Sequence, residues 1–258
     1  MTRSYKTKGI VIRRYNVGEA DRLLDIYTPT LGKIKIKARG VRRTQSKLAG
    51  HLEIFSETDL VLVPGKSADI VTGARAINFW PAIRDDLTRT AIAYYFCELV
   101  FWLTEEGYKD TRLYNLLYWS LAALDSWEDS NDVSRDLFVA NVELLFLDRL
   151  GYRPELKKCA ATGDDLQPEQ NYFSAVAGGV VCQKNKDSIP VSVNTIKVLR
   201  LMTEDKVKPD RWQKIPIAVR NEAKKTVREF VHYTLEKKLK AESFLEMIPS
   251  LMSQIESS

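Results

Sequence analysis

Residues 33–39 read Lys-Ile-Lys-Ile-Lys-Ala-Arg, a strict alternation of cationic and apolar side chains. Successive side chains of a β-strand point to opposite faces of its sheet, so this run predicts a strand with two unlike faces. Ile34, Ile36 and Ala38 are expected to face a core, and the cations are expected to face solvent. The chain must therefore build a sheet with one buried and one positively charged face. The four cations are Lys33, Lys35, Lys37 and Arg39.

Further short runs in the first 80 residues also predict strands, because they are apolar or β-branched and are separated by turn residues such as Pro64-Gly65. Five strands at this spacing, with one long loop, favour a small closed barrel over a sandwich. The predicted strands cover residues 9–13, 23–27, 33–39, about 54–63 and about 69–79.

A basic loop without periodicity follows the alternating strand, bounded by Gly40 and Gly50. The charge of the whole chain is similarly uneven. Residues 1–80 carry 15 Lys and Arg against 7 Asp and Glu, residues 81–150 carry 6 against 13, and residues 151–258 carry 18 against 14. A positive module beside an acidic one suggests that a polyanion binds the first, although a solvated face would also explain it. The cations of the loop are Arg42, Arg43 and Lys47.

From Pro81 onward the apolar pattern becomes helical. Residues 153–190 lose this period and are interrupted by Gly and Pro, so we expect an irregular insert within one helical bundle. The predicted fold class is α+β, with a barrel over residues 1–80 and a helical domain over residues 81–258. The predicted helices cover about residues 87–102, 112–127, 133–150, 193–202 and 216–239.

Signals for catalysis are weak. The run Pro64-Gly65-Lys66-Ser67 ends like a phosphate-binding loop, but Leu60 stands where that loop needs its first Gly. The two histidines, His51 and His232, have neither metal nor triad spacing. We therefore expect that the protein is not an enzyme.

Cys159 and Cys182 flank the central part of the insert. A zinc ribbon needs a second thiolate three residues after each cysteine, and these positions hold Thr162 and Asn185. Two thiols without a nearby histidine form at most half a site, so we expect neither zinc nor another cofactor. The three cysteines do not suit a disulfide framework, and no long apolar run or apolar leader occurs, so we expect a cytoplasmic protein without membrane contact.

Several segments, in order along the chain, are similar to those of a known family. They read Gly-Ile-Val-Ile-Arg at 9–13, Gly-Glu-Ala-Asp-Arg-Leu-Leu at 18–24, Tyr-Thr-Pro at 27–29 with Gly-Lys at 32–33, Ala-Arg-Gly-Val-Arg-Arg at 38–43 and Ser-Lys-Leu-Ala-Gly at 46–50. Together they resemble the N-terminal domain of RecO, the bacterial recombination mediator. The resemblance extends over nearly the whole chain through Leu-Asp-Arg-Leu-Gly-Tyr-Arg-Pro at 147–154 and Tyr-Phe-Ser at 172–174 leading to Gly-Gly-Val-Val-Cys at 178–182.

The resemblance implies an N-terminal OB-fold, a C-terminal helical bundle and a small zinc-finger-like insert at about 153–190. It also implies binding of single- and double-stranded DNA, annealing of complementary strands, and help in loading recombinase onto single strands coated by single-strand-binding protein. The implied partners are RecR, the C-terminal tail of single-strand-binding protein and, indirectly, RecA, in the nucleoid of the bacterial cytoplasm. Several family members carry two C-x-x-C pairs in the insert. Here Thr162 and Asn185 replace the second cysteine of each pair, which departs from that pattern.

The expected DNA-binding residues are cations, because Lys and Arg bind phosphates without reading the base sequence. Alternate residues of a strand lie about 6.6 Å apart, close to the spacing of phosphates on an extended single strand. Tyr5, Tyr15 and Tyr27 are candidates for stacking on bases, but which of them faces outward stays open. Cations near the last predicted helix could extend the surface or form a solvated face. The predicted DNA-binding residues are Lys33, Lys35, Lys37, Arg39, Arg42, Arg43 and Lys47.

Two other functions fit the same features. An OB-type RNA-binding or translation accessory protein would also present a basic barrel to a polyanion. A purely structural adaptor would instead use an apolar helical surface to hold partner peptides, and its contact with nucleic acid would be incidental.

Overall fold

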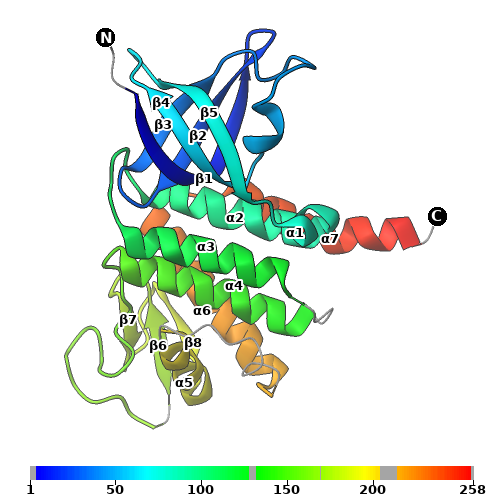
Figure 1. Ribbon diagram of the computed structural model, residues 1–258. Helices are drawn as coiled ribbons and strands as arrows, with labels where there is room; N and C mark the ends of the chain where they lie inside the picture. Colours follow the sequence, from blue (N-terminus) through cyan, green and yellow to red (C-terminus); the bar gives the residue numbers. More distant parts are fainter. Residues whose placement is uncertain (1–3, 128–131, 169, 204–213, 257–258) are drawn as a thin grey trace. The chain divides into compact units, whose positions relative to one another are not determined.

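The computed structural model describes residues 4–127, 132–168, 170–203 and 214–256, and its ribbon is shown in Figure 1. Contacts within the chain concentrate in two compact units. One unit consists of residues 1–127 together with 239–258, and the other consists of residues 128–238. The first unit therefore contains helices as well as the barrel, and its limit does not fall at the predicted boundary after residue 80.

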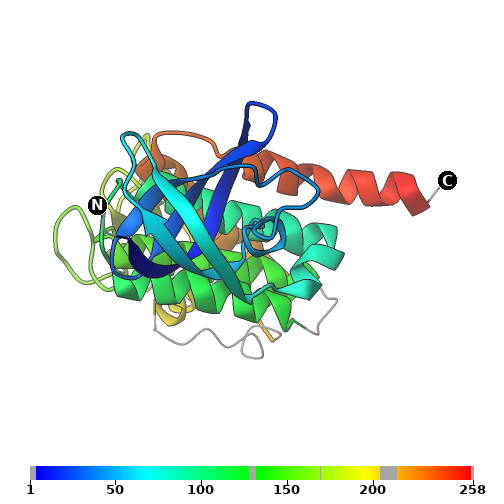
Figure 2. The same cartoon turned by 45° about the horizontal axis from the view of Figure 1, so that its top comes forward.

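Five strands close into the predicted barrel, in the order β1-β2-β3-β5-β4, which is an OB-like arrangement (Figures 1 and 2). Neighbouring strands pair antiparallel except β3 and β5, which form a short parallel ladder that closes the barrel. The expected barrel and the α+β fold class are thus confirmed. The strands are β1 (Tyr5–Val17), β2 (Asp21–Thr28), β3 (Gly32–Ala38), β4 (Glu57–Val63) and β5 (Asp69–Asn78).

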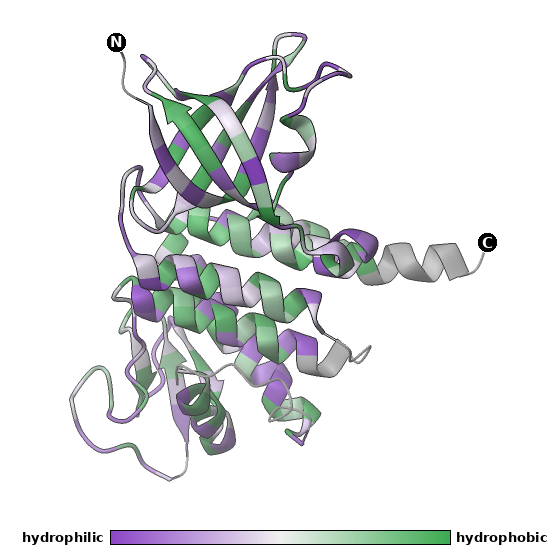
Figure 3. Cartoon of the chain, viewed as in Figure 1, coloured by the Kyte–Doolittle hydropathy of each residue, from purple (hydrophilic) through white to green (hydrophobic). Residues whose placement is uncertain are grey.

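The alternation of β3 organises the barrel core. Ile36 and Ala38 are fully buried, and Lys35 and Arg39 beside them are exposed. Ile34 is only partly buried, so one of the three predicted core positions lies at the margin of the core. Figure 3 shows hydrophilic and hydrophobic stretches alternating along the barrel strands, as expected of strands with one buried face. Other buried core residues are Ile10, Leu24, Ile26, Leu60 and Leu62.

Four α-helices complete the described part of the first unit. The side chain of Asp86 caps α2 by accepting from Arg89 N at 2.7 Å, and Asp110 caps α3 by accepting from Arg112 N at 2.8 Å. The last helix packs against α2, and the carboxylate of Glu98 on α2 accepts from Ala241 N at 2.8 Å. The helices are α1 (Pro81–Asp85), α2 (Leu87–Leu103), α3 (Thr111–Asp125) and α7 (Lys240–Glu256).

In its described residues, the second unit combines three helices with a small sheet. Its strands run in the order β7-β6-β8, and α6 packs against both α4 and α5. Phe173 of β6 contacts Phe230 of α6 edge to face, with ring centroids 5.7 Å apart. The insert therefore contains more regular structure than predicted, because strands this short do not show a two-residue period. The elements are α4 (Asp132–Arg149), β6 (Asn171–Ser174), β7 (Gly179–Val181), β8 (Ser188–Val191), α5 (Val193–Met202) and α6 (Ile217–Leu235).

Gly32, the first residue of β3, lies against the loop that follows α2. Its φ is +69°, and a Cβ built on it would lie 2.1 Å from the carbonyl oxygen of Tyr108. In the same region Gly107 N donates to the carbonyl oxygen of Lys33 at 2.9 Å. A side chain at position 32 would therefore push the barrel away from the helices of its own unit.

We expect Gly32→Ala to lower the free energy of unfolding by about 2 kcal/mol or more, because a left-handed residue with a Cβ costs roughly 1–2 kcal/mol before any clash. Urea unfolding followed by circular dichroism measures the change. Gly18→Ala is the matched control, since Gly18 has φ +58° but no heavy atom within 4 Å of its built Cβ. Equal losses in the two variants would contradict the importance of the close approach.

Candidate nucleic-acid interface

Five of the seven predicted cations are exposed on β3 and the loop that follows it. We call these five residues the basic surface. No ion pair to any of them is found among the described residues, so their charges are available to a polyanion. The basic surface consists of Lys35, Arg39, Arg42, Arg43 and Lys47.

Lys33 is held inside the first unit. Its Nζ donates to the carbonyl oxygens of Phe101 and Thr104 and lies 4.3 Å from the centroid of the Phe101 ring. These carbonyls end α2, where the helix dipole favours a cation. Burial lowers the pKa of Lys33. Lys33 therefore connects β3 to α2, and we do not count it among the cations available to phosphate.

Lys37 is partly buried and forms an ion pair with Asp21 of β2, with 3.0 Å between Nζ and Oδ2. The same carboxylate accepts from Gly40 N at 2.8 Å. These contacts, led by the hydrogen bond from Gly40, lower the pKa of Asp21. Lys37 thus helps to hold the first residue of the basic loop, and its charge is largely compensated.

The basic loop is fixed at its start to the turn between β1 and β2. Arg42 N donates to the carbonyl oxygen of Ala20 at 2.9 Å, and Arg42 Nη1 donates to that of Gly18 at 3.2 Å. The loop ends in a short 3-10 turn, η1 (Ala49–His51). The cations Arg42 and Arg43 are therefore carried by a loop with defined contacts to the turn between β1 and β2.

Arg13 of β1 was not among the predicted cations. A β-bulge between Val11 and Arg13 shifts the register, and Arg13 then lies opposite Asp25 of β2. Asp25 also lies opposite Lys35, which is an outward residue of β3. Since directly opposed residues share a face, Arg13 lies on the outer face of the sheet as well. Three consecutive buried residues, 10–12, precede it. Such a break in alternation is the sequence signal of a bulge.

The three tyrosines proposed for base stacking differ in exposure. Tyr27 is fully buried, and the hydroxyl of Tyr5 donates to the carboxylate of Asp69. Tyr15 is 39% exposed. Tyr15 is therefore the member of this group that is best exposed to a base.

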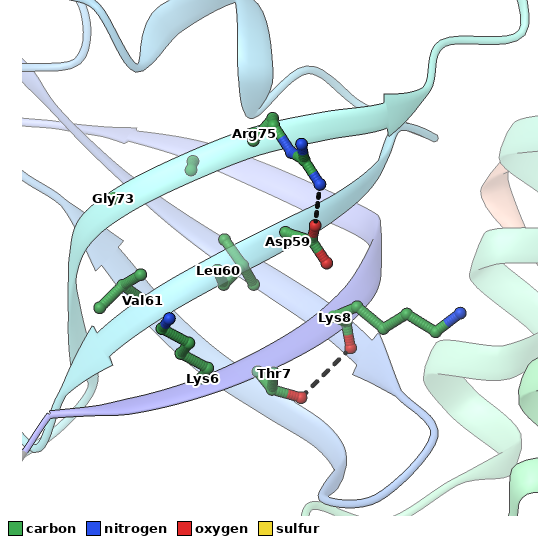
Figure 4. A pocket seen from close by; sticks show the side chains of 9 residues that line it. Lys6, Thr7, Lys8, Asp59, Leu60, Val61, Gly73 and Arg75 are labelled. Atoms are coloured by element: carbon green, nitrogen blue, oxygen red, sulfur yellow. Dashed lines mark hydrogen bonds and ion pairs between the residues drawn. The ribbon is translucent and has the colours of Figure 1, made fainter.

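A groove of about 540 Å³ lies on another side of the barrel, between β1, β4 and β5 (Figure 4). Two of its three cations are compensated, since Arg75 Nη2 lies 2.9 Å from Asp59 and Lys8 Nζ lies 3.2 Å from Glu57, while Lys6 also lines the groove. Figure 4 shows the ion pair of Arg75 along the groove. The groove is therefore a weaker candidate for binding a polyanion than the basic surface.

The cations of α6 belong to the second unit. Lys224 forms an ion pair with Asp136 of α4, with 2.8 Å between Nζ and Oδ2, while Lys225 is exposed. Whether these residues extend the DNA-binding surface stays a prediction. The other predicted cations are Arg228 of α6, Lys237 and Lys238 after α6, and Lys240, which begins α7 in the first unit.

The segment that resembles a phosphate-binding loop, residues 64–67, and His51 both make contacts that support the barrel fold. Gly65 N donates to the side chain of Asp69 at 3.1 Å, and the segment forms the turn between β4 and β5 rather than leading into a helix. His51 Nδ1 accepts from Ala76 N at 3.4 Å beside β5. These contacts explain both motifs as parts of the barrel, and the non-enzymatic role stays a prediction.

The cysteines of the insert lie beside each other. Sγ of Cys159 accepts from Cys182 N at 3.4 Å. A hydrogen bond with the side chain of Thr162 lowers the pKa of Cys159 to about 6. Burial and the neighbouring Cys159 raise the pKa of Cys182. Hydrogen bonds of Cys159 thus hold the turn in which a zinc knuckle would bind its metal.

These residues do not fit a zinc ion. Tetrahedral zinc takes four Cys or His ligands, and Cys159 and Cys182 supply two. Asn185 N instead donates to Ser188 Oγ at 2.9 Å in a tight turn. Within the described residues there is no group of three or more His, Cys, Asp or Glu that could hold a metal.

With this geometry in view, comparison with protein families identifies the chain. A model described as "Recombination protein O N terminal" matches residues 1–80, and one described as "Recombination protein O C terminal" matches residues 84–243. The chain belongs to the RecO family. The resemblance seen in the sequence is thereby confirmed.

RecO proteins from several organisms are similar to this chain over most of its length. The DNA repair protein RecO of Dehalococcoides mccartyi strain 195 is 36% identical over 247 residues, covering 95% of this chain and 96% of that protein. That of Roseiflexus sp. is 36% identical over 254 residues, covering 97% and 88%. That of Symbiobacterium thermophilum is 28% identical over 252 residues, covering 95% and 98%.

Among the helices of the described parts of this RecO family member, none combines the length and apolar character required to span a bilayer.

We expect purified protein to contain far less than one zinc per chain and to keep its circular dichroism spectrum in EDTA, because only two zinc ligands are present. Elemental analysis measures the metal. The control is the double variant Thr162→Cys with Asn185→Cys, which restores two C-x-x-C pairs and is expected to bind one zinc. One zinc per chain in the unaltered protein would contradict the expectation.

Proposed function

We propose that this RecO-family chain is a non-enzymatic DNA repair protein that binds single- and double-stranded DNA through the basic surface. The observation that carries the proposal is the concentration of five exposed cations on one strand and its adjoining loop, without carboxylate partners in the described part of the chain. Membership of a family whose members are named DNA repair proteins supports DNA as the polyanion.

Binding by this surface depends on phosphate rather than on base identity. Each Lys or Arg that meets a phosphate releases condensed counter-ions, which provides affinity without sequence preference. Lys35 and Lys37 lie on the same face of β3, and Arg39 follows directly after the strand. The spacing of about 6.6 Å between successive outward residues suits the backbone of an extended strand. Repair at arbitrary sites needs this lack of preference.

Annealing of complementary strands follows from the same charge. Two DNA strands repel each other, and a protein that neutralises phosphates on both lowers this repulsion without any chemical step. The basic surface contains one cation on a strand, Lys35, and four on the loop that follows, so it offers more than one line of contact. We therefore propose strand annealing as an activity of this chain.

The mediator role and its partners are part of the same proposal. By resemblance to the family, the chain would help RecA load onto single strands coated by single-strand-binding protein, and would contact RecR and the C-terminal tail of single-strand-binding protein. This activity would be located at the nucleoid of the bacterial cytoplasm. The predicted sequence-independent binding supports this role, since a mediator must act on any exposed single strand.

We expect simultaneous reversal of Arg39, Arg42 and Arg43 to Glu to weaken binding of a single-stranded oligonucleotide at least tenfold at low salt. Loss of three phosphate contacts should also flatten the slope of log affinity against log salt by about 2. Fluorescence anisotropy over a salt titration measures both effects. The control reverses the exposed Lys157, Lys184 and Lys186 of the insert, which changes net charge equally. The proposal would be contradicted if the lysine variant bound the oligonucleotide as weakly as the arginine variant, or if the arginine variant bound it as tightly as the unaltered protein.

We expect the unaltered protein to accelerate annealing of complementary oligonucleotides, both free and coated with single-strand-binding protein. Reversal of the three arginines should abolish the acceleration, because strand repulsion is then no longer screened. A fluorescence-quenching assay with strands labelled at opposite ends follows the reaction. Annealing at the spontaneous rate would refute this activity, and tighter binding of structured RNA than of DNA would favour an RNA-binding function instead.

A further inference from the structure

Arg13 of β1 is surrounded by three aromatic rings in the first unit. Its Cζ lies 3.9 Å from the centroid of Phe101, 4.9 Å from that of Tyr15 and 5.9 Å from that of Trp102. Phe101 and Trp102 belong to α2, and their rings meet edge to face with centroids 5.0 Å apart. We call these three aromatic residues the aromatic cluster. A cation at these distances holds aromatic faces in place.

Two rings of the aromatic cluster are substantially exposed. Trp102 is 44% exposed and Tyr15 is 39% exposed, while Phe101 is partly buried behind them. Adjacent exposed aromatics on one surface mark a binding site more often than single exposed residues do. Trp and Tyr suit this role because a rigid ring provides a large contact area.

The aromatic cluster continues the basic surface on the same sheet. Asp25 of β2 lies opposite both Arg13 of β1 and Lys35 of β3, so these three residues form one row across the outer face. Neighbouring strands are about 4.8 Å apart, which separates Arg13 and Lys35 by about 10 Å across two strand intervals. A single-stranded chain can therefore contact both groups at once.

The next row places Tyr15 in the same relation to β3. Leu23 of β2 lies opposite Tyr15 and also opposite Lys37. The outer face of β1–β2–β3 thus carries an aromatic side at β1 and a cationic side at β3. A single-stranded nucleic acid has the matching arrangement, with bases on one side of a phosphate backbone.

Asp25 is the middle residue of the first row. It is buried, and its burial raises its pKa, while the charges of Lys35 and Arg13 act in the opposite direction. The two cations at the ends of the row therefore act electrostatically on the same carboxylate, although neither forms an ion pair with it among the described residues.

We propose that Trp102 and Tyr15 form a platform on which bases of single-stranded DNA stack while Lys35 and Arg39 bind the neighbouring phosphates. This inference rests on the proposed DNA-binding function and adds the part of the surface that distinguishes single strands from duplexes. In a duplex the bases are stacked on each other, so the platform contributes only when bases are unpaired.

The experiment compares an oligo-dT strand with an abasic strand of the same length, which has the same phosphates but no bases. The full chain should bind oligo-dT about tenfold or more tightly than the abasic strand, which corresponds to the stacking of one or two bases. The double variant Trp102→Leu with Tyr15→Leu should lose this preference and keep its affinity for the abasic strand. Trp119→Leu is the matched control, because Trp119 of α3 is 66% exposed in the same unit.

The conservative variant Trp102→Phe with Tyr15→Phe keeps two aromatic faces and should retain most of the preference. A second measurement leaves the platform residues unchanged. Oligo-dT should quench the tryptophan fluorescence of the Trp119→Phe variant more than the abasic strand does. A preference that survives in the Leu variant, or equal binding and equal quenching with both strands, would overturn the platform.

Binding of the abasic strand distinguishes a wrong assignment of the platform from a wrong assignment of the DNA-binding function. If the abasic strand binds and reversal of Arg39, Arg42 and Arg43 releases it, the phosphate contacts stand even where the platform does not. If the abasic strand does not bind, or binds regardless of the three arginines, the basic surface itself is refuted.

Discussion

Burial of the small apolar row of β3 fixes the direction of every charge on that strand. Ile36 and Ala38 are enclosed by the barrel, so Lys35 and Arg39 cannot turn inward without exposing the core. A shift of the strand by one residue would exchange the two sets, and would place ammonium groups in an apolar interior at a cost of several kcal/mol each. The position of the basic surface is therefore determined by the hydrophobic core and not by attraction between its own residues, which repel one another.

The sequence was informative where the pattern is local. The alternation of β3 and the turn at Pro64-Gly65 each depend on neighbours in the chain, and the structure confirms the strand and the turn. The closed barrel also followed from the number and spacing of strands. The short strands of the insert were missed, since three or four residues do not establish a period.

Contacts between distant residues explain the remainder. Lys33 repeats the pattern of Lys35, yet its partners are carbonyl oxygens 68 and 71 residues further along. Lys37 pairs across the sheet with Asp21, a contact that depends on strand register. In the sequence, Trp102 is one of many apolar residues in a helix that is apolar around much of its circumference, so the pattern does not single it out. Only the packing of α2 against the barrel places it beside Tyr15 and Arg13.

The nested arrangement of the two units affects how the protein is made. Residues 239–258 return to the unit that residues 1–127 begin, and α7 packs against α2. During translation the ribosome must therefore produce the entire second unit before the helix that covers α2 emerges. Completion of the barrel-containing unit therefore waits for synthesis of the second unit, even though the barrel strands are synthesised first.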